Sequence, residues 1–171
     1  YFKDLNASEY LKYFTKKYQK VDLNYIKDYF LNSGFHDESK LYISLTSDNF
    51  EIKDINFKII FSKNIKFFSL NGNLKDSLIK DNNYLYLKIR KEAFLNTIYN
   101  KRSWEDISIG FQNRQFRKPN KYNSDFWYHF SNKYVSKKFV KSTTDCSSCI
   151  SLNQDIQNVI FNKIDTKKNY I

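Results

Sequence analysis

The chain has 171 residues, 41% of them hydrophobic and 19% aromatic, so it can bury a core of its own and is not disordered throughout. Its formal net charge of +11 fits a surface for nucleic acid, an anionic membrane or an acidic partner, but also lysines spread over solvated faces. No stretch reaches the about 18 apolar residues of a membrane span and no signal peptide is recognisable, so we expect a cytoplasmic protein.

Residues 1–36 have the spacing of a helical hairpin. Asp22 is placed to cap the second helix, and Gly34 stands at its expected C-terminus. The apolar side chains recur at helical spacing in both segments: Leu11, Phe14 and Tyr18 in the first, and Leu23, Ile26 and Phe30 in the second.

From Leu41 the apolar period changes to two, which is typical of strands. The alternating segments are LYISLTS, INFKIIF, IKFFSL and YLYLKIR, and turn-forming Asn, Gly and Asp residues separate them. FQNRQF predicts a last strand, which Pro119 closes. We therefore expect an α+β fold with a mainly antiparallel sheet of about five strands over residues 41–118, covered by helices.

Helical spacing returns within and after the sheet. Residues 75–80 fit a short helix or a loop, and residues 91–100 fit a helix. Ser103 resembles the first residue of a capping box, and Asn123 or Ser124 can cap an aromatic helix. Residues 123–171 are expected to end in helices, so residues 1–171 are predicted to form a single domain.

Catalytic and metal-binding motifs are missing from the sequence. Its three glycines are too few for a phosphate-binding loop, and His36 and His129 do not have zinc-finger spacing. Cys146 and Cys149 form a lone CxxC. This motif fits two thiols without a chemical role, a redox or disulfide pair, or a metal site shared with another chain. We expect no catalytic residue, no bound metal and no cofactor.

The stretch Ser103–Tyr134 combines cations with aromatic side chains. Such a mixture is typical of proteins that bind single-stranded nucleic acid, although the same aromatics also have core spacing or could line an apolar cavity. Its cations are Arg114, Arg117, Lys118 and Lys121, near Phe111, Phe116, Tyr122 and Trp127, and the cations Arg90, Lys91, Lys101 and Arg102 precede the stretch.

Within this stretch, the succession W-E-D, I-G-F-x-x-R-x-x-R-x-P and Y-N before an aromatic helix resembles a C-terminal region of metallo-β-lactamase-fold proteins related to CMP-N-acetylneuraminate hydroxylase. The preceding KEAFLNTIYNKRSWED is similar in layout to the sterol-carrier-protein-2-like domain. The catalytic members need an HxHxDH-type cluster, which two histidines cannot supply. Asn120 departs from the family's usual Asp.

The resemblance implies a non-catalytic accessory domain that works with a metal-dependent catalytic domain absent from this chain, or that forms a homodimer. It further implies an apolar pocket for a lipid-like ligand, with Arg114 and Arg117 holding an anionic head group or a partner carboxylate. The pocket candidates are Trp104, Phe111, Phe126, Trp127 and Phe130. The alternative function is a basic, aromatic nucleic-acid-binding domain.

Overall fold

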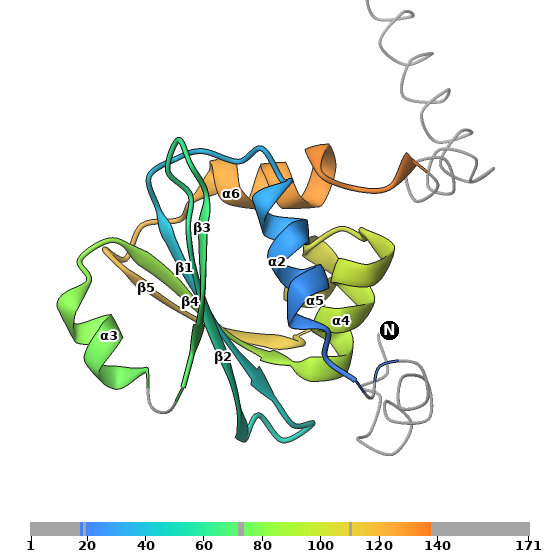
Figure 1. Cartoon of the computed structure of the whole chain (residues 1–171), viewed down its shortest axis with the longest axis horizontal. Coiled ribbons are helices and arrows are strands. Elements are labelled where there is room, and N and C mark those ends of the chain that lie inside the picture. Colours follow the sequence, from blue (N-terminus) through green and yellow to red (C-terminus); the bar gives the residue numbers. More distant parts are fainter. Residues whose placement is uncertain (1–17, 19, 72–73, 110, 138–171) are drawn as a thin grey trace, which may run out of the picture. The chain divides into compact units, whose positions relative to one another are not determined.

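The structure is a computed structural model, shown in Figure 1, and it describes residues 18, 20–71, 74–109 and 111–137. The chain divides into two compact units, Tyr1–Val135 and Ser136–Ile171. All helices and strands given below belong to the first unit. The predictions for Leu11 and Phe14, for the two cysteines and for the final helix lie outside the described residues.

Five strands form one mixed sheet in the order β3-β2-β1-β4-β5. They are β1 (Lys40–Thr46), β2 (Ile52–Ile60), β3 (Lys66–Leu70), β4 (Tyr84–Arg90) and β5 (Asn113–Lys118). Three of the four pairings are antiparallel, whereas β1 and β4 are parallel. The predicted α+β fold with a mainly antiparallel sheet of about five strands is confirmed.

The connection between β3 and β4 is a crossover and not a hairpin. It contains α3 (Lys75–Lys80) and returns the chain to β1, beside which β4 lies in parallel. Parallel neighbours need a long connection, and residues 71–83 provide it. The hairpin-like spacing in the sequence did not indicate this pairing.

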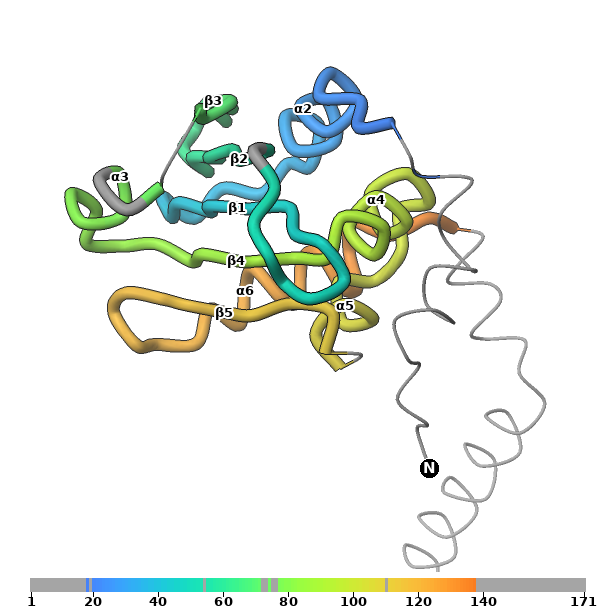
Figure 2. The backbone as a smooth tube through the Cα atoms, turned by 90° about the horizontal axis from the view of Figure 1, so that it is seen from below, coloured from blue at the N-terminus to red at the C-terminus, as the bar shows by residue number. Residues whose placement is uncertain are grey.

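The other helices cover one face of the sheet. They are α2 (Leu23–Leu31), α4 (Lys91–Asn100), α5 (Glu105–Ile109) and α6 (Ser124–Tyr128), and the π-helical turn η1 (His129–Lys133) extends α6. Figure 1 shows these helices on one side of the sheet and α3 on the other. In Figure 2, α3 and α4 lie at opposite ends of β4.

Predicted capping residues begin two of these helices. The Asp22 carboxylate accepts hydrogen bonds from the backbone N–H groups of Asn24 and Tyr25 at the start of α2. The Asn123 side chain accepts one from the Phe126 N–H at 2.9 Å. Gly34 follows α2 with a φ of +68°, a left-handed conformation that glycine adopts without strain.

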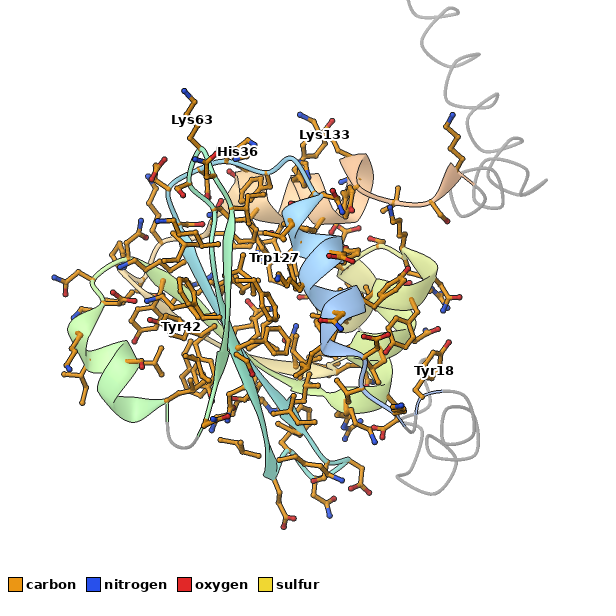
Figure 3. All side chains as sticks on the ribbon, in the orientation of Figure 1. Tyr18, His36, Tyr42, Lys63, Trp127 and Lys133 are labelled. Carbon is orange, nitrogen blue, oxygen red and sulfur yellow. The ribbon has the colours of Figure 1, made fainter. Side chains whose placement is uncertain are left out.

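Alternation along the strands creates the main core. Leu41, Ile43 and Leu45 of β1 face the helices and are almost fully buried. Trp104 lies at the centre of the helical layer and donates its indole N–H to the Tyr29 hydroxyl at 2.9 Å. Figure 3 shows how densely side chains fill this side of the sheet.

A smaller cluster ties α3 to the other face of the sheet. The carboxylate of Asp81, directly after α3, accepts hydrogen bonds from the Tyr42 hydroxyl and from the ammonium groups of Lys40 and Lys58. Leu74 packs against the same tyrosine. Burial would raise the pKa of Asp81, but these three donors lower it to about 2.

Candidate ligand-binding site

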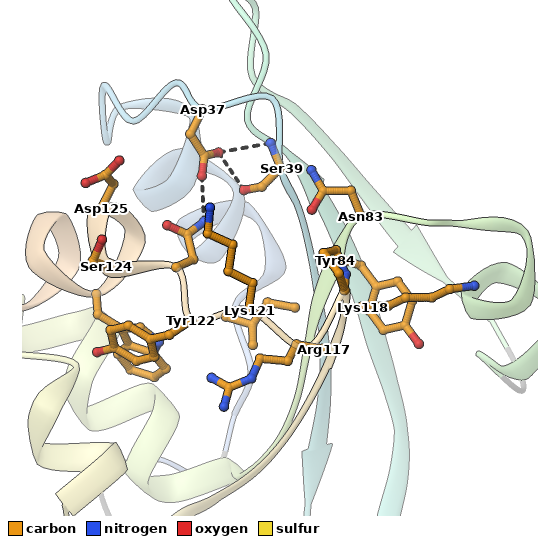
Figure 4. A pocket seen from close by; sticks show the side chains of 14 residues that line it. Asp37, Ser39, Asn83, Tyr84, Arg117, Lys118, Lys121, Tyr122, Ser124 and Asp125 are labelled. Carbon is orange, nitrogen blue, oxygen red and sulfur yellow. Dashed lines mark hydrogen bonds between the residues drawn. The ribbon is translucent and has the colours of Figure 1, made fainter.

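A surface pocket of about 310 Å³ lies where the end of β5 and the following loop meet the start of β4. Figure 4 shows side chains from these elements, from α6 and from the loop before β1 around one depression. The lining residues are Asp37, Ser39, Asn83, Tyr84, Leu85, Arg117, Lys118, Pro119, Lys121, Tyr122, Asn123, Ser124, Asp125 and Trp127.

Asn123 connects the parts of the chain that form the pocket. Its side-chain oxygen caps α6, as described above, and its amide group donates to Asp37 at 2.7 Å. The other carboxylate oxygen of Asp37 accepts from the backbone N–H and the hydroxyl of Ser39. One amide therefore holds the start of α6 against the loop that leads into β1.

The side chains around the pocket have an excess of positive charge. Arg117, Lys118 and Lys121 are exposed, and none of them forms an ion pair within the part of the chain that the structure describes. Of the two lining carboxylates, Asp37 already accepts three hydrogen bonds. These bonds leave Asp37 little capacity to pair with the cations. Since the three cations also outnumber the two carboxylates, the pocket favours an anion.

Aromatic side chains supply the other lining surface. The Arg117 guanidinium lies 5.9 Å from the centre of the Tyr122 ring and donates to the Asn120 side chain at 3.2 Å. Tyr122 is exposed, and Tyr84 and Trp127 complete the aromatic lining. In Figure 4 the Lys118 side chain extends away from the Arg117 guanidinium.

The structure separates the seven residues that the sequence proposed as a site. Trp104, Phe126 and Phe130 are at most 1% exposed. Their ring centres are 4.9–5.5 Å apart, so the rings pack directly against one another. They lie in the core, and reaching them would require a ligand to part these rings.

Two of the seven, Arg117 and Trp127, line the pocket. Phe111 and Arg114 lie at the opposite end of β5. Phe111 is 75% exposed, and the guanidinium of Arg114 stacks 3.9 Å from the centre of the Phe50 ring. The pocket and this second location are therefore separate surfaces.

His129 does not line the pocket. Its Nε2 is 2.9 Å from the Ser33 carbonyl oxygen, and its ring contacts that of Phe35. Burial lowers its pKa below the ordinary value. Among the described residues, no group of three or more His, Cys, Asp or Glu side chains could hold a metal ion. No described helix is long and apolar enough to span a membrane.

Sequence reasoning missed the residues that complete the pocket from distant segments. Asp37 and Ser39 precede β1, while Asn83 and Tyr84 begin β4. The run Asp81-Asn82-Asn83 indicated a turn but not its neighbours. Only the pairing of β4 with both β1 and β5 brings these residues to one end of the sheet.

Fold and pocket together define a class: an α+β domain that presents a basic, aromatic pocket at one end of a mixed sheet. Comparison with known protein families, curated proteins and solved structures finds no match. The resemblance to the accessory region of metallo-β-lactamase-fold proteins therefore stays a prediction.

Proposed function

We propose that the chain is a non-catalytic binding module, and that it holds an anionic group in the pocket at the end of β5. The main support is the set of three exposed cations, Arg117, Lys118 and Lys121, without carboxylate partners among the described residues. Salt-bridged or hydrogen-bonded anions are the natural partners of such groups.

The lining of the pocket also indicates the chemical nature of the uncharged part of the ligand. Tyr84, Tyr122 and Trp127 offer apolar area beside the cations, so the anion would be attached to a flat or apolar group. The volume of about 310 Å³ is at the lower end of small-molecule sites. A phosphate or carboxylate on a ring, or an acidic and aromatic segment of a partner protein, shares this chemistry.

The accessory role remains part of the proposal. The resemblance described above supports a module that works beside a metal-dependent catalytic domain or in a homodimer, and the basic pocket would then bind that partner's carboxylate. A lipid-like ligand in the interior is less favoured, because Trp104, Phe126 and Phe130 already fill the space between helices and sheet.

Calorimetric titration with 1-naphthyl phosphate tests the pocket. Arg117→Gln and Lys121→Gln should each weaken binding about 10-fold, since a hydrogen bond to a charged group contributes about 1.5 kcal/mol or more. Lys133→Gln, an exposed lysine of η1 outside the pocket, is the matched control. Uncharged 1-naphthol should bind more weakly than the phosphate.

Two results would contradict the proposal. Equal loss in the control variant would show general charge attraction, and unchanged affinity in both pocket variants would place the anion elsewhere. Native mass spectrometry of the purified chain adds an independent outcome: a co-purified lipid at one copy per chain would favour the apolar interior instead.

A further inference from the structure

The second face of the sheet presents a ladder of aromatic and cationic side chains where β4 pairs with β5. Neighbouring residues of a strand point to opposite faces, so every second residue belongs to this face. The cross-strand pairs on it are Tyr84 with Lys118, Tyr86 with Phe116, and Lys88 with Arg114. We call these six residues the β4–β5 open face.

An exposed aromatic ring forms the middle of the β4–β5 open face. Phe116 is 49% exposed, and its ring stacks on Tyr86 with centres 5.7 Å apart and planes 28° apart. The Lys88 ammonium lies 5.4 Å from the Phe116 ring centre. Tyr86 is buried and donates to or accepts from the Ser44 hydroxyl at 3.0 Å. The inner ring is thus held in place, and the outer ring is about half exposed to solvent.

Cations flank the ring on both sides along the strands. Lys118 lies before the aromatic pair on the β4–β5 ladder, and Lys88 and Arg114 lie after it. None of the three forms an ion pair among the residues that the structure describes. Arg114 and Lys118 are four residues apart in β5, about 14 Å at about 3.4 Å per residue.

The approach to this face is open on one side. β5 is an edge strand, and Figure 2 shows it at the border of the sheet with β4 as its neighbour. α3 packs on the same face through Leu74 and Leu78, against Tyr42 of β1. A ligand with an extended chain can therefore lie along β5, beside α3.

We propose that the β4–β5 open face binds single-stranded nucleic acid. A base stacks on Phe116, and the neighbouring phosphates lie near Lys88, Arg114 and Lys118. Single-strand binders combine these two elements, since every base has a π face and every phosphate a charge. The charge of the face selects a polyanion, and the exposed ring between its cations selects one that carries stacking groups.

The site is distinct from the pocket of the proposed function. Arg117 and Lys121 line that pocket, whereas Phe116, Lys88 and Arg114 do not. Tyr84 and Lys118 belong to both surfaces, so both are left unchanged in the test. Either proposal can therefore fail without the other.

Fluorescence anisotropy with a fluorescein-labelled oligothymidylate of about 15 nucleotides tests the inference. Phe116→Ala should weaken binding about 5- to 150-fold, the range for loss of one stacked base, while Phe116→Trp should retain it. Lys88→Gln and Arg114→Gln should each reduce the slope of log affinity against log salt by about 0.7.

The chain provides a matched aromatic and cationic pair as a control. Lys133 lies 5.2 Å from the Tyr128 ring centre, in α6 and η1 on the helical side of the sheet. Tyr128→Ala and Lys133→Gln should leave oligothymidylate affinity within a factor of about 2. Circular dichroism spectra of all variants should coincide, because both rings are about half exposed.

Three outcomes would overturn the inference. Phe116→Ala could bind the oligonucleotide as tightly as the unaltered chain. Tyr128→Ala could lose as much affinity as Phe116→Ala. Heparin, which has charge but no bases, could bind as tightly as oligothymidylate at equal salt, which would identify a general polyanion surface. Unchanged naphthyl phosphate binding by Phe116→Ala would confirm that the two sites are independent.

Discussion

Replacing Asp81 by Asn should destabilise the domain by about 2 kcal/mol at neutral pH. The side chain of Asp81 is only 12% exposed and accepts hydrogen bonds from Lys40, Tyr42 and Lys58. These contacts lower its pKa from 3.8 to about 2. Since one pKa unit corresponds to about 1.4 kcal/mol, they stabilise the folded state by about 2 kcal/mol when the carboxylate is ionised.

The sign of the pH dependence follows from the direction of the shift. A carboxylate whose folded pKa is lowered contributes its full stability above the unfolded value, near pH 4. As the pH falls from about 4 to about 2, the unfolded chain takes up the proton first, and the contribution disappears. The difference in unfolding free energy between the original chain and Asp81→Asn should therefore shrink across this interval.

Urea unfolding followed by tryptophan fluorescence at several pH values between about 2 and 7 measures this difference. Asp106→Asn is the matched control, because Asp106 pairs with Arg102 on the surface at 3.1 Å with both side chains more than 40% exposed. Such a pair contributes about 0.5 kcal/mol or less. A cost of Asp81→Asn no larger than that of Asp106→Asn, or an equal cost at pH 2 and at pH 7, would contradict the role assigned to Asp81.

Three further changes test the core, the cap and the buried histidine. Phe130→Ala should cost about 3–5 kcal/mol in urea unfolding, because it empties space among fully buried rings; a cost below about 1 kcal/mol would contradict the described packing. Asn123→Ala should cost about 1–2 kcal/mol through the lost α6 cap and the lost bond to Asp37, whereas Ser124→Ala, beside it, should cost less. Burial lowers the pKa of His129, so protonation favours the unfolded chain and stability should fall as the pH drops below about 6.5. In His129→Gln this decline should be smaller, and an identical decline in both chains would contradict the assignment.

Several parts of the fold follow from local sequence because their causes are local. The period of two from Leu41 onward predicts strands, since one face of each strand must be apolar to be buried. Asp22 and Asn123 predict helix starts, because a short polar side chain satisfies the first free N–H groups of the following turn. The α+β class and the approximate strand number were therefore accessible from the sequence.

Which aromatic and basic residues lie in the core and which line a binding surface could not be predicted from the sequence. Trp104 and Trp127 both belong to the stretch Ser103–Tyr134, yet Trp104 is at the centre of the core and Trp127 also lines the pocket. The resemblance implies that Arg114 and Arg117 hold one anion together. Because they are three positions apart in a strand, their side chains point to opposite faces of the sheet. The pairing of β5 with β4 therefore places them on separate surfaces.

The sequence by itself thus determined the five strands, most of the described helices, two helix caps and the strongly basic, aromatic character of Ser103–Tyr134. Only the tertiary structure decided that β4 lies between β1 and β5, because strand order depends on packing between distant segments. That order brings Asp37, Tyr84 and Arg117 to one pocket and places Phe116 beside Tyr86 on the β4–β5 open face. Both proposed binding surfaces depend on contacts between residues far apart in the chain. Local periodicity does not predict such contacts, because it reflects only which side of a single helix or strand is buried.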